Sequence, residues 1–256
     1  MKRRRDGPIL SGIRALGSAV VFLGRILAQI GPAIVRRPAL VVDQIYNAGG
    51  RSLIIVMLSG LFVGMVLSLQ GYSLLQRFGS EEALGVAAAV GLLKELGPVV
   101  SALLFAGRAG TALTSEIGLM RATDQLTAME IMAVDPVRVV VAPRFLGGLL
   151  SVPLLAAIFD VVGIFGAWLV GVRMLGVNAG AFWSQMQSAV STRTVTEGIV
   201  KSCVFGLACS LIAVHQGYHS EATARGVGLA TTRTVVASSV LVLLLDYIIT
   251  AAFIEP

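Results

Sequence analysis

The sequence predicts an all-α integral membrane protein with an N-terminal interfacial amphipathic helix, about five transmembrane helices and a cytoplasmic helix between the second and third. Composition is the first observation: the chain is 56% hydrophobic and only 13% charged, whereas a soluble domain carries about 25% charged residues. Five apolar segments also reach the roughly 20 residues that cross a hydrocarbon core. Lys and Arg, finally, concentrate in alternate connecting segments, as in polytopic membrane proteins.

The five predicted spans are residues 52–76, 83–107, 145–172, 198–214 and 234–254. The third contains Pro153 and is expected to bend there or to break into two pieces. No internal repeat or soluble domain is evident, so residues 1–256 are taken as one membrane domain.

Residues 8–37, ahead of the first span, predict an amphipathic helix lying in the membrane interface. On a helical projection, five polar residues gather within about a sixth of the circumference: Ser11, Arg14, Ser18, Arg25 and Gln29. Apolar residues cover much of the rest: Ile9, Ile13, Leu16, Val20, Leu23, Leu27 and Ile30.

The basic residues predict the orientation. The N-terminal region and the second and fourth connections together hold 15 Lys and Arg, whereas the first and third connections hold 3. Because Lys and Arg favour the cytoplasmic side, we expect a cytoplasmic N-terminus and a periplasmic C-terminus. The net charge of +6 then fits an anionic membrane surface better than nucleic acid, because no basic patch interleaved with aromatics is present.

The second connection, Arg108 to Arg144, is the longest of those expected in the cytoplasm. Within it, residues 116–135 predict a helix that stops at Asp135-Pro136. Its methionines and mixed charges suit a docking surface for a soluble partner, although a solvated helix with no partner fits the composition equally well.

Five ionisable residues lie inside the predicted spans: Lys94, Glu95, Asp160, Lys201 and Asp246. Each costs about 2.5–3.5 kcal/mol on insertion scales, so such groups face a cavity or one another. Adjacent helical residues point about 100° apart, so Lys94 and Glu95 need partners elsewhere, and Lys201 and Asp246 are the candidates.

Gly97 and Pro98 follow the charged pair and predict a kinked or locally opened backbone beside it, because proline cannot donate to the Lys94 carbonyl. This arrangement favours a site next to a ligand-filled space. The alternative is a set of structural ion pairs, which has most weight for Asp160. Glu197 is expected at the outer interface.

The sequence carries no GxxxxGK[ST] loop, HExxH motif or Ser-His-Asp arrangement, so an enzyme is disfavoured. No metal or cofactor site is predicted.

The run LLKELGPVVSALLFAGRAGTALTSEIGLMRATDQLTAMEIMAVDPVRVVVAPR, Leu92 to Arg144, resembles the MlaE-type permease family of lipid-transporting ABC transporters. The motifs are Glu95-Leu96-Gly97-Pro98-Val99, Ala106-Gly107-Arg108, Glu116-Ile117-Gly118, Met120-Arg121, Asp124-Gln125, Val134-Asp135-Pro136 and Pro143-Arg144. The segments GLFVGMVLSLQGY, Gly60 to Tyr72, and ATTRTVV, Ala230 to Val236, are also similar to the family. Two positions depart from it with charge retained: Lys94, where some members have arginine, and Asp124, where glutamate is common.

The resemblance implies a non-enzymatic homodimeric permease in the inner membrane of a Gram-negative bacterium. It implies a cytoplasmic ABC ATPase that binds the ATP, a periplasmic hexamer of MCE-domain subunits and a STAS-domain subunit. The assembly would move phospholipid between inner and outer membranes and maintain outer-membrane lipid asymmetry.

Two sets of residues acquire expected roles from the resemblance. The lipid-binding candidates are Lys94, Glu95, Leu67, Leu74, Leu75, Phe78, Lys201 and Asp246, with Gly97 and Pro98 as the hinge. The ATPase-coupling candidates, on the coupling helix of residues 116–135, are Glu116, Arg121, Asp124, Gln125 and Glu130.

Two other functions stay open from the sequence. One is an ATP-independent secondary transporter with Glu95 and Asp246 as proton carriers. The other is a membrane scaffold whose span charges are only structural.

Overall fold

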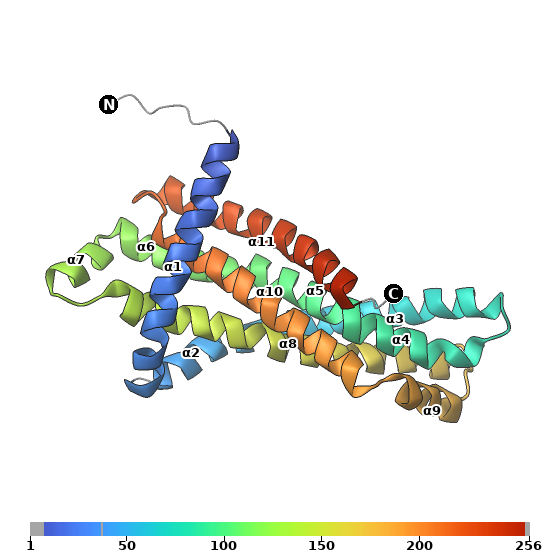
Figure 1. Cartoon of the computed structure of the whole chain (residues 1–256). Helices are drawn as coiled ribbons and strands as arrows, with labels where there is room; N and C mark the ends of the chain where they lie inside the picture. The colour runs from blue at the N-terminus through green and yellow to red at the C-terminus, as the bar shows by residue number, and fades with distance from the viewer. Residues whose placement is uncertain (1–7, 37, 254–256) are drawn as a thin grey trace.

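The fold is a bundle of long helices crossed near one end by the N-terminal helix (Figure 1). The structure, a computed structural model, describes the backbone of residues 8–36 and 38–253 and the side chains of residues 17–31 and 39–253. Three parts of the predicted segments lie outside the described residues. They are residues 1–7 with the basic run MKRRRDG, Arg37 at the end of the predicted interfacial helix, and Ile254 at the end of the fifth predicted span. No strand occurs within the described ranges.

The bundle contains α3 (Leu53–Gln76), α4 (Leu84–Gly91), α5 (Gly97–Phe105), α6 (Thr111–Ala122), α8 (Ala142–Trp168), α10 (Thr192–Tyr218) and α11 (Ala224–Phe253). The peripheral helices are α1 (Pro8–Arg36), α2 (Pro38–Ala48), α7 (Gln125–Ile131) and α9 (Ala179–Ala189). Two 3-10 turns are η1 (Gly50–Ser52) and η2 (Glu81–Ala83). Four π-helical turns are η3 (Leu92–Leu96), η4 (Ala106–Gly110), η5 (Val137–Val141) and η6 (Leu169–Met174).

Five continuous helical stretches are long and apolar enough to cross a membrane, which confirms the predicted number: Ala39–Gln76, Glu81–Ala122, Val137–Met174, Thr192–Tyr218 and Ala224–Phe253. All five are longer than the predicted segments because helix continues through residues that the sequence placed outside the spans. Arg108 is one of these: it lies in η4, and its guanidinium donates to the Asn47 carbonyl at 3.1 Å and to Ser52 Oγ at 3.0 Å. The third span is one continuous helix through Pro153.

The predicted single helix over residues 116–135 is two helices. α6 runs from the membrane span to Ala122, and α7 begins at Gln125. Asp124 between them has φ of 56°, a left-handed conformation that Asp tolerates because its short side chain can bond locally. α7 therefore projects from the bundle at the end that we call the α7 end, opposite the α9 end (Figure 1).

α1 crosses the bundle near its α7 end (Figure 1). Within its described side chains, Phe22 and Ile26 are buried while Val20, Val21 and Leu27 are exposed. Phe22 packs against His215, Tyr218 and His219 of the α10 end, with ring centroids 5.3 to 5.6 Å apart. One stripe of the helix thus packs on the bundle, and another apolar stripe stays uncovered.

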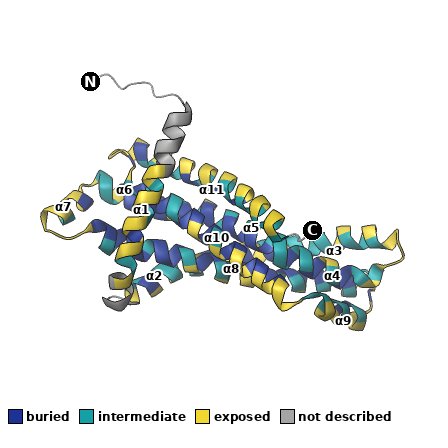
Figure 2. Ribbon diagram, in the orientation of Figure 1, coloured by how far each residue is buried: buried dark blue, intermediate teal, exposed yellow. Residues whose placement is uncertain are grey.

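Small residues let α3 and α8 approach closely. A Cβ at Gly64 would overlap the Gly163 carbonyl, and one at Gly166 would overlap the Leu61 carbonyl. Small residues drive helix association in membranes through close packing of this kind. Buried residues follow the inner helices, whereas α11 is largely exposed (Figure 2). α11 buries only a stripe at four-residue spacing: Gly226, Ala230, Thr234, Ser238 and Val242.

Gly64→Ala is expected to destabilise the bundle by about 1–3 kcal/mol, the usual cost of overpacking, because α3 must move away from Gly163. The measurement is thermal unfolding of the purified protein in detergent, with Gly228→Ala as control. A Cβ at Gly228, in α11, meets nothing within 4 Å. Equal melting temperatures for the two variants would contradict the close-packing account.

Candidate functional site

The second span opens into a π-helical turn at its charged pair. η3 holds Lys94 and Glu95 and is followed directly by Gly97 and Pro98 of α5, where the sequence predicts an opened backbone. π-turns inside α-helices are rare and occur frequently at functional sites. Pro98 has no N–H to offer the Lys94 carbonyl, and that carbonyl accepts a hydrogen bond from Lys201 Nζ at 2.9 Å.

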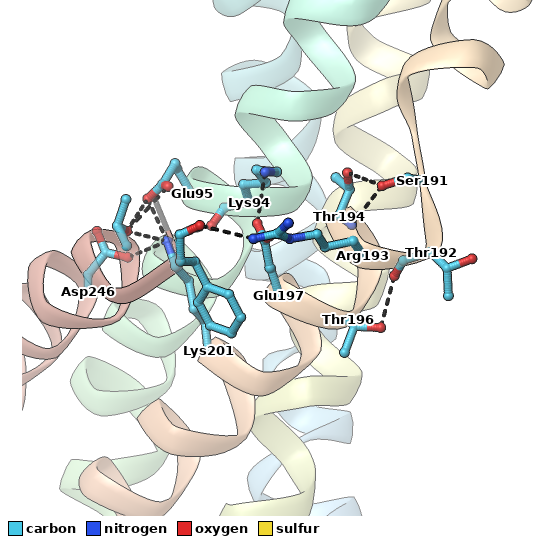
Figure 3. Close-up of polar contacts among 12 residues, drawn as sticks. Lys94, Glu95, Ser191, Thr192, Arg193, Thr194, Thr196, Glu197, Lys201 and Asp246 are labelled. Carbon is cyan, nitrogen blue, oxygen red and sulfur yellow. Dashed lines mark hydrogen bonds and ion pairs between the residues drawn. The ribbon is translucent and has the colours of Figure 1, made fainter. Parts of the chain in front are cut away.

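Lys201 of α10 joins three spans. Its ammonium lies 2.8 Å from Glu95 Oε2 and 3.0 Å from Asp246 Oδ1 of α11. It also donates to Thr250 Oγ1 at 2.7 Å. Only 3% of the Lys201 side chain is exposed, against 41% for Glu95 and 22% for Asp246. The ammonium is thus the buried centre of the group, and the two more exposed carboxylates converge on it from the second and fifth spans (Figure 3).

Lys94 takes a different partner from those that the sequence suggested. Its Nζ lies 2.8 Å from Glu197 Oε2. The sequence suggested Lys201 and Asp246 as the partners of Lys94 and Glu95. Only Glu95 has one of these partners, Lys201. Glu197 is 93% buried at its side chain and also pairs with Arg193 at 3.1 Å. Arg193 in turn donates to the Phe253 carbonyl at 3.2 Å. We call Lys94, Glu95, Glu197, Lys201 and Asp246 the charged cluster (Figure 3).

Arg193 and Thr250 are site residues that the sequence did not predict, and Glu197, which was expected at the outer interface, is buried within this site. A signal for two of them was present, because Arg193, Glu197 and Lys201 recur at four-residue spacing and therefore share a helix face. That periodicity marks the face of α10 that packs against the second span. Thr250 is one turn of α11 beyond Asp246 and lacks such a signal.

The apolar lipid-binding candidates do not gather in one place. Leu67 lines a groove of about 300 Å³ together with Phe62, Val66, Gln70 and Leu96, next to Glu95 in the chain. Leu75 packs on a separate small core that contains Leu84 and Phe182. Leu74 and Phe78 are exposed. The structure thus brings Leu67 to the second span beside the charged cluster and leaves the other three nearer the α9 end.

The coupling candidates also divide. Glu116 pairs with Arg144 at 3.3 Å, and the Arg121 guanidinium donates to the Tyr218 carbonyl, so both contact neighbouring helices of the same chain. Asp124, Gln125 and Glu130 are exposed on or beside α7. The exposed surface at this end is therefore carried by α7 and the α6–α7 turn.

These features define a polytopic α-helical membrane protein with a charged site between three of its spans. Among proteins of that class, a profile of the family described as Permease MlaE matches residues 41–252. The chain therefore belongs to this family.

Several relatives share most of the chain. It is 49% identical over 254 residues to the intermembrane phospholipid transport system permease protein MlaE of Haemophilus influenzae, covering 95% of this chain and 97% of that protein. A probable ABC transporter permease protein of Rickettsia felis is 37% identical over 87% of both chains. The chloroplastic protein trigalactosyldiacylglycerol 1 of Arabidopsis thaliana is 28% identical over 84% of this chain and 61% of its own length.

Lys201→Met is expected to destabilise the protein by about 3–5 kcal/mol, because it leaves the Glu95 and Asp246 carboxylates without their cation. The cost should fall toward the lower end of this range, because Glu95 is partly exposed. Lys94→Met is expected to cost less, because Glu197 keeps Arg193. Chemical or thermal unfolding in detergent measures both. A triple variant, Lys201→Met with Glu95→Gln and Asp246→Asn, should recover much of the loss. If Lys94→Met proved the more damaging single variant, the pairing would be wrong.

Proposed function

We propose that the chain is the transmembrane permease subunit of an ABC transporter that moves phospholipid between the inner and outer membranes and so maintains outer-membrane lipid asymmetry. The observation that carries this is the 49% identity to a protein named as an intermembrane phospholipid transport permease, over 97% of that protein's length. The charged cluster supports it, since a polar site between apolar spans suits a ligand with a charged head and apolar chains.

The polar head of the lipid meets the exposed members of the cluster. Lys94 is 35% exposed at its side chain, whereas Lys201 is almost fully buried. Lys94 can therefore turn to a lipid phosphate as a point charge, while Glu197 retains Arg193. Lys201 acts as the structural centre that fixes Glu95. Leu67 and the groove beside it accept an acyl chain, and Leu74, Leu75 and Phe78 extend the apolar surface toward the α9 end.

ATP is bound and hydrolysed by a partner, so this chain is a non-enzymatic subunit without a cofactor of its own. The partner is an ABC ATPase that docks on α7, through Asp124, Gln125 and Glu130. Arg121 and Glu116 contribute by fixing α6 to Tyr218 and Arg144. Because α7 follows α6 directly, α6 fixed in this way transmits movement of α7 from the ATPase into the spans.

The remaining assembly follows the family. Two copies form a homodimer with a central cavity between the first, second and fifth spans. The uncovered apolar face of α11, with Val236, Val240, Leu243 and Leu244 exposed, suits such a cavity or contact. A periplasmic hexamer of MCE-domain subunits and a STAS-domain subunit complete it. The protein lies in a Gram-negative inner membrane with its α7 end and N-terminus in the cytoplasm and its C-terminus in the periplasm.

The Lys94→Ala, Glu95→Ala double variant is expected to lose ATP-driven phospholipid transport while still assembling. The reason is that the exposed polar end of the lipid site is removed and the buried Lys201–Asp246 pair is kept. Transfer of labelled phospholipid by the reconstituted transporter measures it, with co-purification of the ATPase as the assembly control. Full transport by the double variant would refute the assignment. Lipid uptake that needs no ATPase would instead favour the proton-coupled alternative.

Added positive charge on the exposed face of α7, as in Gln125→Lys with Glu130→Lys, is expected to weaken ATPase binding by about tenfold or more, the factor that corresponds to 1.4 kcal/mol. Co-purification and binding assays measure this. Glu82→Lys, an exposed substitution at the α9 end, is the matched control. Unchanged ATPase binding by the α7 variant would place the docking surface elsewhere.

A further inference from the structure

A second groove lies between α8 and α10, beside η3 of the second span. Its volume is about 220 Å³, and its walls are mainly apolar. Leu93 of η3 lines it, with Val161 and Ile164 of α8 and Val195 and Ile199 of α10. Val161, Val195 and Ile199 are exposed. The groove therefore opens on the apolar outer surface of two neighbouring spans.

Asp160 is the ionisable residue that lines this groove, and it has no basic partner among the described residues. The residue is 8% exposed, and its Oδ1 lacks a hydrogen-bond partner among the described residues. Glu95, Glu197 and Asp246, in contrast, each have a basic group within 4 Å. A buried polar atom without a partner is rare in native proteins and calls for an explanation such as a missing ligand.

The backbone makes room for this carboxyl group. Asp160 lies against Gly97, where a Cβ would overlap the carboxyl oxygens. Gly97 thus has a packing role besides ending η3, and the carboxyl group is held beside the turn that carries Lys94 and Glu95. Ser202 Oγ, also in the groove, donates its proton to the Ile199 carbonyl at 2.8 Å, so that proton does not serve Asp160.

We propose that this groove is a second phospholipid site, selective for head groups that carry a primary amine. The ammonium donates to Asp160 and supplies a counter-charge, since a lone buried carboxylate costs far more than one with an opposite charge beside it. The acyl chain lies along Val161, Val195 and Ile199. The inference rests on the phospholipid permease function above and adds a head-group class that the charged cluster does not define.

The test is native mass spectrometry of the delipidated protein, titrated with phosphatidylethanolamine or phosphatidylglycerol of identical acyl chains. The wild type should bind phosphatidylethanolamine about tenfold more tightly, equivalent to 1.4 kcal/mol. Asp160→Asn should abolish the preference. Ala157→Phe, which fills the groove without changing charge, should abolish it too and guards against an effect of Asp160→Asn on folding. Asp43→Asn, an exposed Asp on α2, should retain it.

A preference that survives both Asp160→Asn and Ala157→Phe would overturn the proposal, as would a wild type without preference. ATP-driven lipid transfer is measured separately on the same variants. A wild type that transfers lipid normally but shows no preference for phosphatidylethanolamine would overturn this site alone. A wild type that neither binds nor transfers phospholipid would overturn the proposed function itself.

Discussion

The ammonium of Lys201 is the contact on which the central part of this structure depends. It is almost fully buried, and it joins the second, fourth and fifth spans through Glu95, the Lys94 carbonyl, Asp246 and Thr250. A cation buried in apolar surroundings is tolerated only when several partners surround it. Because these partners come from three helices, their relative positions are fixed at one level of the bundle. Glu95 is thereby held outward, next to Lys94.

The same level of the bundle is where the second span departs from α-helical geometry. The π-turn and Pro98 leave the Lys94 carbonyl available to Lys201. Lys94 itself is turned to Glu197, whose second partner, Arg193, comes from its own helix. The second span thus contributes to two ionic groups. In one, the buried Lys201 contacts Glu95 and Asp246, and in the other, the partly exposed Lys94 contacts Glu197. Asp160 lies against Gly97, and its Oδ1 has no hydrogen-bond partner among the described residues.

Much of this follows from the sequence and part of it does not. Hydropathy predicts five spans, and Pro98 beside Lys94 and Glu95 predicts an opened backbone, because both depend on local chemistry. The choice of ion partners depends on how three helices are rotated about their axes, and so Lys94 pairs with Glu197 rather than with the expected carboxylate of α11. The left-handed turn at Asp124 likewise divides a segment whose apolar spacing predicts one helix. Leu74, Leu75 and Phe78 are separated from Leu67 because α3 extends well past the charged cluster.

The central claim is that the opened turn before Pro98 takes part in lipid transport. The direct measurement is ATP-driven phospholipid transfer by the reconstituted transporter carrying Pro98→Ala, which restores a backbone donor to the Lys94 carbonyl. Pro153→Ala, at the proline inside α8, is the matched control. The account predicts that Pro98→Ala assembles normally and loses most of its transfer activity, while Pro153→Ala keeps it. Unimpaired transfer by Pro98→Ala would contradict the account.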